Sequence, residues 1–203
     1  MKKVLFVPGL GSTRRNGDYR NLLTAAGGGG QPAEFVPINW EGTAPDGWLD
    51  RLRRAYDHHE SQDVILAGFS MGAVTALRAA AERPPAGLLL CSLSPYFKET
   101  VGYMPDEWRR MNHHLVRAFG KVSLDNLVAK VGCTTAVLVG DAEHACMFTT
   151  AQRAATLLLD ASFHEVPGAG HDMLQGGYVD AVGKVAHELQ LQVAPLASSR
   201  TAS

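Results

Sequence analysis

The segment Asp63–Arg83 constrains the fold more than any other part of the chain. It begins with the apolar run Val64–Ala67, which is short enough to be a buried β-strand. It continues as an alanine-rich helical pattern that is ended by Pro84-Pro85. Between the two, residues 68–72 read Gly-Phe-Ser-Met-Gly, with Ser70 at the centre. The segment therefore predicts a strand, a sharp turn that carries a serine, and a helix.

A Gly-x-Ser-x-Gly turn of this kind holds its serine hydroxyl above the edge of the sheet, because the two glycines leave room for a strained backbone. The N–H group of the next residue, Met71, points to the same place from the N-terminus of the helix. The simpler interpretation is a glycine-rich turn whose serine only caps the helix. With 21 glycines in 203 residues the motif also arises by chance, so other parts of the chain must support a chemical role.

The composition allows one well-packed domain, since 46% of the 203 residues are hydrophobic. The net charge is −1 and only 19% of the residues are charged, which gives no sign of a basic, nucleic-acid-binding surface. Cys91, Cys133 and Cys146 lack metal-ligand spacing and favour a reducing compartment. We therefore expect a cytoplasmic protein without a metal or cofactor.

The first apolar run resembles a secretory signal, but Pro8 and Gly9 interrupt it, so we expect a strand there. No segment of the sequence is long and apolar enough for a membrane span.

Apolar strand patterns and helical patterns alternate along the chain. Besides the strand before Ser70, strands are predicted at residues 4–8, 34–39, 87–93, 135–139 and 162–166. Helices are predicted from about residue 46, over 123–131, from about 149 to 159, and over 178–189. Pro37 favours an edge position for the second strand. The expected fold is α/β, with a mostly parallel six-stranded sheet flanked by helices, as one domain over residues 1–190 and a disordered tail over 191–203.

In parallel sheets, functional sites form beyond the carboxyl ends of the strands. Ser70 follows the third predicted strand, Gly-Asp-Ala-Glu-His at 140–144 follows the fifth, and Pro-Gly-Ala-Gly-His-Asp at 167–172 follows the sixth. A serine becomes a good nucleophile only when a base takes its proton and a carboxylate orients that base. The order serine, acid, histidine at three strand ends predicts such a group.

With these motifs the chain resembles an α/β-hydrolase over about residues 4–189, as a small esterase-like or thioesterase-like member. The resemblance implies that Ser70 is the nucleophile and His171 the base. It also implies an oxyanion hole made by the backbone N–H groups of Leu10 and Met71. The chain departs from the family by lacking its first antiparallel hairpin and by carrying Pro8 where the family's His-Gly-x-Gly turn has histidine.

The acid of the triad is the least certain member. In the family, the loop after the fifth strand commonly reads Gly-x-x-Asp, which maps the carboxylate onto Glu143. Asp141 is the alternative, and Glu99, after the fourth strand, is a more distant one. We favour Glu143 and expect Asp141 to hold the turn of the loop, as aspartates commonly do.

Residues 94–120 are longer than a strand-to-helix connection requires, and they lie where the family carries a cap or lid. Five side chains in this segment are expected to line an apolar substrate pocket: Phe97, Tyr103, Met104, Trp108 and Met111. A small separate core is the alternative interpretation. His113 and His114 are adjacent and cannot face the same way on a helix, so they do not indicate a metal site.

The function expected from these features is hydrolysis of a carboxylic ester or thioester through an acyl-enzyme. Two alternatives remain open: an acyltransferase or biosynthetic thioesterase with the same triad, and a non-hydrolytic ligand-binding member of the fold. The expected partner is a small molecule with an apolar acyl or aromatic part, and neither nucleic acid nor a membrane span is expected. The sequence predicts neither the acyl length nor the oligomeric state.

Overall fold

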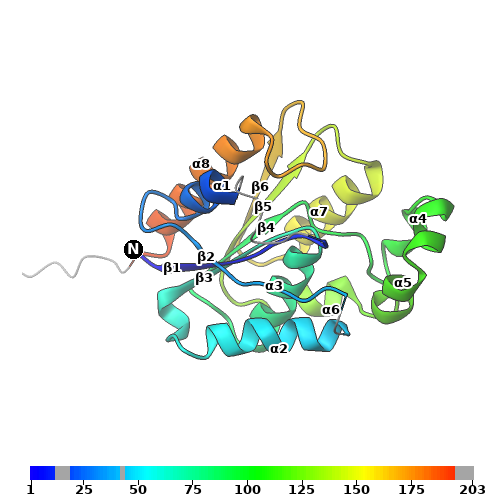
Figure 1. Ribbon diagram of the computed structural model, residues 1–203, viewed down its shortest axis with the longest axis horizontal. Coiled ribbons are helices and arrows are strands. Elements are labelled where there is room, and N and C mark those ends of the chain that lie inside the picture. Colours follow the sequence, from blue (N-terminus) through cyan, green and yellow to red (C-terminus); the bar gives the residue numbers. More distant parts are fainter. Residues whose placement is uncertain (12–18, 42–43, 195–203) are drawn as a thin grey trace, which may run out of the picture.

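The computed structural model describes residues 1–11, 19–41 and 44–194 (Figure 1). Within these residues a parallel sheet has the strand order β2-β1-β3-β4-β5-β6. The strands are β1 (Lys3–Val7), β2 (Glu34–Phe35), β3 (Val64–Phe69), β4 (Gly87–Cys91), β5 (Thr134–Gly140) and β6 (Ala161–Val166). The prediction of a six-stranded parallel α/β sheet is confirmed, and β2 lies at an edge as expected.

Helices cover both faces of the sheet (Figure 1). The α-helices are α1 (Tyr19–Ala26), α2 (Pro45–Tyr56), α3 (Met71–Glu82), α4 (Asp106–Met111), α5 (His113–Phe119), α6 (Leu124–Val128), α7 (Ala145–Leu157) and α8 (Gly176–Gln192). Two short 3-10 helices are η1 (Ser61–Asp63) and η2 (Val101–Tyr103). Residues of α1 and α8 share one core with the sheet, and residues of α2, α3, α6 and α7 share the other.

The strands are apolar on both sides because both sides are covered. In β1, Leu5 and Val7 face the core of α2 and α3, whereas Val4 and Phe6 face the core of α1 and α8. Every residue of β3 is buried. A strand buried on both faces reads as a continuous apolar run, which is why β3 was recognisable from sequence.

Some predicted boundaries are wrong for local reasons. Strand β2 pairs only over Glu34–Phe35 instead of 34–39; Val36 still donates its N–H to Phe6 O, and Pro37 next has no N–H to donate. Helix α7 begins at Ala145 rather than near 149, because the His144 ring accepts the Cys146 N–H at 3.2 Å and caps it.

Helix α6 is shorter than the 123–131 predicted, and α1 was not predicted at all. Helix α8 continues to Gln192, so the predicted start of the tail at 191 is wrong, and residues 195–203 lie outside the described part of the chain.

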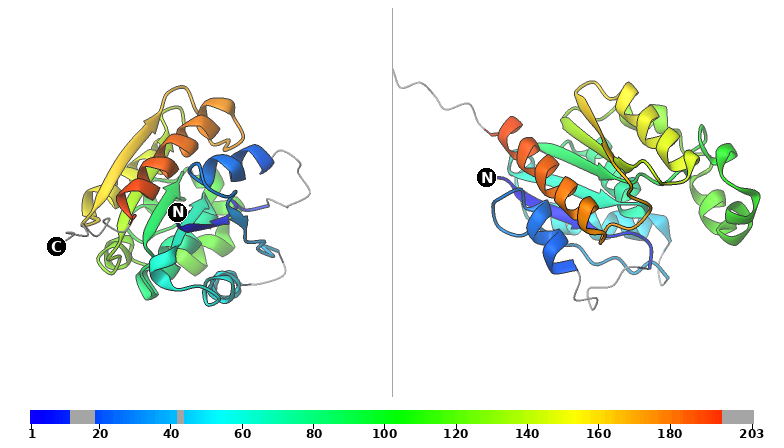
Figure 2. Two further views of the ribbon diagram at one scale, coloured as in Figure 1. Left: turned by 90° about the vertical axis from the view of Figure 1, so that its left-hand side faces the viewer. Right: turned by 90° about the horizontal axis from the view of Figure 1, so that it is seen from above.

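Residues 94–120 contain η2, α4 and α5, and these short helices project beyond the carboxyl ends of the strands (Figures 1 and 2). The division into one domain with a cap over this segment stays a prediction. None of the helices in the described part of the chain is long and apolar enough to cross a membrane.

Candidate active site

Ser70 lies at the sharp turn between β3 and α3, with φ of 56° and ψ of −118°. Its N–H group donates to Cys91 O on β4 at 2.9 Å, which holds the turn against the next strand. A Cβ atom on Gly68 would lie 2.3 Å from Gly72 O, and one on Gly72 would lie 2.1 Å from Val7 O. Both positions therefore require glycine, and the turn predicted from the sequence motif is present.

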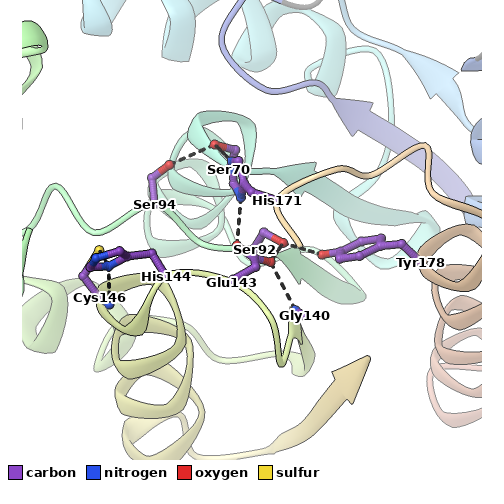
Figure 3. Close-up of polar contacts among 9 residues, drawn as sticks. All are labelled: Ser70, Ser92, Ser94, Gly140, Glu143, His144, Cys146, His171 and Tyr178. Carbon is purple, nitrogen blue, oxygen red and sulfur yellow. Dashed lines mark hydrogen bonds and ion pairs between the residues drawn. The ribbon is translucent and has the colours of Figure 1, made fainter. Parts of the chain in front are cut away.

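A continuous line of hydrogen bonds joins Ser70, His171 and Glu143 (Figure 3). Ser70 Oγ lies 3.0 Å from His171 Nε2, and His171 Nδ1 lies 2.8 Å from Glu143 Oε2. A carboxylate can only accept, so the ring proton lies on Nδ1, and Nε2 is left to accept the Ser70 hydroxyl proton. This is the arrangement in which an imidazole can act as a base towards a serine.

The two candidate carboxylates in the β5 loop have different surroundings. The Glu143 side chain is buried, and its Oε1 accepts the Gly140 N–H at 3.1 Å. Asp141 is exposed, and its Oδ1 accepts the Gly168 N–H at 2.7 Å, which ties the β5 loop to the β6 loop. Glu99 bonds Ser123 Oγ and Leu124 N instead, at the start of α6. The structure brings Glu143, and neither alternative, to the His171 ring.

Two buried hydroxyls beside Glu143 were missed by sequence reasoning. Ser92 Oγ donates to Glu143 Oε1, and Tyr178 Oη on α8 lies 2.6 Å from Ser92 Oγ. Burial raises the pKa of Tyr178 well above its usual value. Ser92 and Tyr178 are 86 positions apart, so no local pattern in the sequence could have paired them.

A third missed hydroxyl contacts the candidate nucleophile itself. Ser94, which follows β4, is buried, and its Oγ lies 3.1 Å from Ser70 Oγ. Because Ser70 donates its only proton to His171, Ser94 must be the donor in this pair. Ser94 therefore places a hydrogen-bond donor on the oxygen that would react.

Ser70 and His171 open into a cavity of about 510 Å³. Leu10 and Met71 both line this cavity, and Met71 begins α3, where the first N–H groups have no partner within the helix. The two residues expected to supply the oxyanion donors thus line the cavity that also contains Ser70.

Residues 94–120 contribute only part of the expected pocket. Met104 and Trp108 line the cavity, but Phe97 is fully buried in the core, and Tyr103 and Met111 are exposed on the surface. Most of the remaining apolar and aromatic lining comes from residues that the sequence analysis did not select: Tyr19, Phe69, Tyr96, Met147, Met173, Leu174 and His144. No lysine or arginine of the described residues lines this cavity.

The histidines outside this line of contacts do not gather at a common point. His113 and His114 contact each other edge to face, His164 lies 2.8 Å from Ser162 Oγ, and His144 caps α7 and contacts Trp108. Among residues 1–11, 19–41 and 44–194, no group of three or more histidine, cysteine, aspartate or glutamate side chains could hold a metal ion.

Comparison with known proteins identifies the fold. A model of the alpha/beta hydrolase family matches residues 4–101, just under half of the chain. Est1E from Butyrivibrio proteoclasticus superposes with a TM-score of 0.72 over 95% of this chain and 88% of its own, at 14% identity. The chain has the α/β-hydrolase fold.

Other solved α/β-hydrolase structures agree. Est1E with ferulic acid bound superposes with a TM-score of 0.73 at 13% identity, over 95% of this chain and 89% of its own. The monoacylglycerol lipase of Paleococcus ferrophilus gives 0.68 at 17% identity, over 94% of both chains. No match was found among curated proteins. At these identities the likeness shows the α/β-hydrolase fold alone.

Proposed function

We propose that this protein is a serine hydrolase that cleaves a carboxylic ester through an acyl-enzyme, with Ser70 as nucleophile, His171 as base and Glu143 as acid. The α/β-hydrolase fold and its esterase and lipase neighbours support hydrolase chemistry in general. The observation that carries the more specific proposal is the unbroken line of hydrogen bonds from Ser70 Oγ to Glu143 Oε2, at the wall of an open cavity.

The chemistry follows from the directions of these bonds. Ser70 Oγ attacks the ester carbonyl carbon while its proton passes to His171 Nε2. The carbonyl oxygen becomes an oxyanion, which the backbone N–H groups of Leu10 and Met71 would stabilise. The bond to the leaving oxygen then breaks, and the alcohol departs with the proton from His171.

Water completes the cycle by the same route. It attacks the acyl-Ser70 carbonyl and gives a proton to His171, which returns it to Ser70 Oγ as the carboxylic acid leaves. Throughout, Glu143 stays ionised and stabilises the imidazolium form of His171.

The cavity favours a neutral, apolar or aromatic substrate. Aromatic and methionine side chains dominate its wall, and its charged lining among the described residues is Asp172. A carboxylate there disfavours anionic acyl groups. Est1E, which has the same fold, has been solved with ferulic acid, an aromatic acid, so aromatic esters are the first substrates to test. We propose that residues 94–120 act as a small lid, through Met104 and Trp108.

A fluorophosphonate probe tests the proposal without knowledge of the natural substrate, since it reacts only with an activated serine. The wild-type protein should be labelled at Ser70, and a folded Ser70→Ala variant should not. A panel of p-nitrophenyl esters and acyl thioesters should then show turnover that Ser70→Ala lowers by several orders of magnitude. A well-folded Ser70→Ala that keeps more than about a tenth of the activity would exclude this mechanism.

A further inference from the structure

Glu143 has a second set of hydrogen-bond partners on the side away from His171 (Figure 3). Its Oε1 accepts from the Ser92 hydroxyl and from the Gly140 N–H, while its Oε2 faces His171. Ser92 in turn lies 2.6 Å from the hydroxyl of Tyr178. These groups come from the end of β4, the β5 loop and α8, and Ser92 and Tyr178 are fully buried.

The direction of each bond follows from the number of protons. A serine hydroxyl has one proton, and Ser92 must donate it to Glu143 because an ionised carboxylate has none. Tyr178 must therefore donate its own proton to Ser92. Both hydroxyl dipoles point towards the carboxylate, so each stabilises its negative charge.

Two features indicate that these hydroxyls are more than core packing. Ser92 has φ of 50°, a region that residues other than glycine rarely adopt, and its N–H is fixed to Leu138 O on β5 at 2.7 Å. Tyr178 buries a hydroxyl where phenylalanine would fill the same space without the cost of removing a polar group from water.

We propose that Ser92 and Tyr178 are positioning residues of the active site. In this proposal, a relay from Tyr178 through Ser92 to Glu143 keeps the carboxylate ionised and turned towards His171. The proposal rests on the proposed serine hydrolase function and identifies the residues that position its acid, Glu143.

Among the described residues, the titratable groups that interact with Glu143 lie on different elements. They are His171 on the β6 loop, Tyr178 on α8, Cys91 on β4 and Cys146 on α7. Burial raises the pKa of both thiols and of the tyrosine, so all three are neutral near pH 7.

The aspartates that lie nearest to Glu143 and His171 in the sequence make other contacts. Asp141 accepts the Gly168 N–H, and Asp172 accepts the Leu174 N–H. Among the residue types beside Glu143, histidine is the one that ordinarily titrates between pH 5 and 8.

Removing a hydroxyl from the relay should therefore change the acid side of the pH profile. With fewer donors on Oε1, the negative charge of the Glu143 carboxylate is less well stabilised. The Glu143–His171 pair therefore binds a proton more tightly. The inactive protonated form then persists to higher pH. A lost hydrogen bond to a charged group corresponds to a rise of about one pH unit in the acid-side midpoint, or a tenfold lower rate well below it.

The experiment compares three variants of the full chain with the wild type. Tyr178→Phe removes one hydroxyl and keeps the ring, Ser92→Gly removes the other and suits the positive φ, and the third variant combines both. The matched control is Tyr56→Phe, since Tyr56 on α2 is also buried and donates its hydroxyl to Arg83 O, far from the site. The readouts are the rate of fluorophosphonate labelling against pH, and the pH at which the ring proton resonances of His171 shift in NMR spectra.

We expect the midpoint to rise by about one unit in Ser92→Gly and by less in Tyr178→Phe, with no change in Tyr56→Phe. Because Tyr178 acts through Ser92, the double variant should match Ser92→Gly rather than show the sum of the two shifts. Unchanged midpoints in folded Ser92→Gly and Tyr178→Phe would overturn the relay, as would additive shifts. Absence of wild-type labelling contradicts the serine hydrolase function instead, and the NMR midpoints then still decide whether the relay acts on Glu143 and His171.

Discussion

Replacing Glu143 by glutamine should lower turnover by about four orders of magnitude, the loss that the same carboxylate-to-amide change causes in a serine protease. The hydrogen bonds around the side chain explain why an amide of nearly the same shape cannot substitute. The Gly140 N–H can only donate, so it requires the amide oxygen at the Oε1 position. The amide NH₂ then faces His171 Nδ1 and donates to it, which places the ring proton on the nitrogen next to Ser70.

The magnitude can be built from two contributions. Turning the amide round would restore the useful tautomer but leave the Gly140 N–H buried without a partner, at about 1–3 kcal/mol, so only about one molecule in ten to a hundred is in this form. The lost negative charge also ceases to stabilise the imidazolium, which costs about 4 kcal/mol at an effective dielectric constant of about 20, or roughly a thousandfold. The product agrees with a loss of about 10⁴ or more.

The matched control is Asp141→Asn in the same loop. Asp141 accepts a single backbone N–H through Oδ1, and the asparagine oxygen can accept it equally well. Its turnover should therefore stay within about threefold of wild type, with at most a few degrees lost from the unfolding midpoint. The assay is fluorophosphonate labelling rate and p-nitrophenyl ester turnover, with thermal unfolding to show that both variants are folded. Equal losses in the two variants, or a Glu143→Gln enzyme with a tenth of wild-type turnover, would refute this reasoning.

Three further outcomes are expected. Ser94→Ala should slow fluorophosphonate labelling about fivefold, the equivalent of one hydrogen bond to Ser70 Oγ, while Ser94→Thr keeps most of the rate. Gly72→Ala should destabilise the fold by more than about 3 kcal/mol in denaturant unfolding, because its Cβ would lie 2.1 Å from Val7 O, whereas Gly132→Ala, with open space, should not. Burial raises the pKa of Cys133 to about 11, so iodoacetamide should alkylate it slowly at pH 8, and mass spectrometry should show the rate rising about tenfold per pH unit.

The parts of the fold predicted correctly are those in which one local signal is decisive. Buried strands such as β3 and β5 stand out as apolar runs, and the glycines around Ser70 mark a turn that only glycine allows. The loops after β5 and β6 could be placed on one edge because parallel strands all end there. The preference for Glu143 over Asp141 at the His171 ring came from the resemblance to the Gly-x-x-Asp loop of the α/β-hydrolases, and the structure has that contact.

The features that could not be predicted from the sequence depend on the direction of a side chain or on partners that are far apart in the sequence. Phe97 and Tyr103 lie in the same apolar segment, yet one points into the core and the other into solvent, which no periodicity in a run of short helices determines. Ser92 and Tyr178 meet only because α8 packs against the sheet beside the end of β4. Helix α7 starts early because of a histidine cap, and histidine is not among the residues that usually mark a helix start.

Ser70 and Ser92 share a strained backbone conformation beside adjacent strands, next to the His171–Glu143 pair. Ser70 at the end of β3 and Ser92 just after β4 both have positive φ, a conformation that costs about 1–3 kcal/mol and persists only where the surroundings enforce it. Each is fixed to the next strand, Ser70 N–H to Cys91 O and Ser92 N–H to Leu138 O. Ser70 contacts His171 and Ser92 contacts Glu143, so the same backbone conformation occurs at both ends of the His171–Glu143 pair. A change that lets the backbone relax at either serine should therefore disturb the contacts of the His171–Glu143 pair.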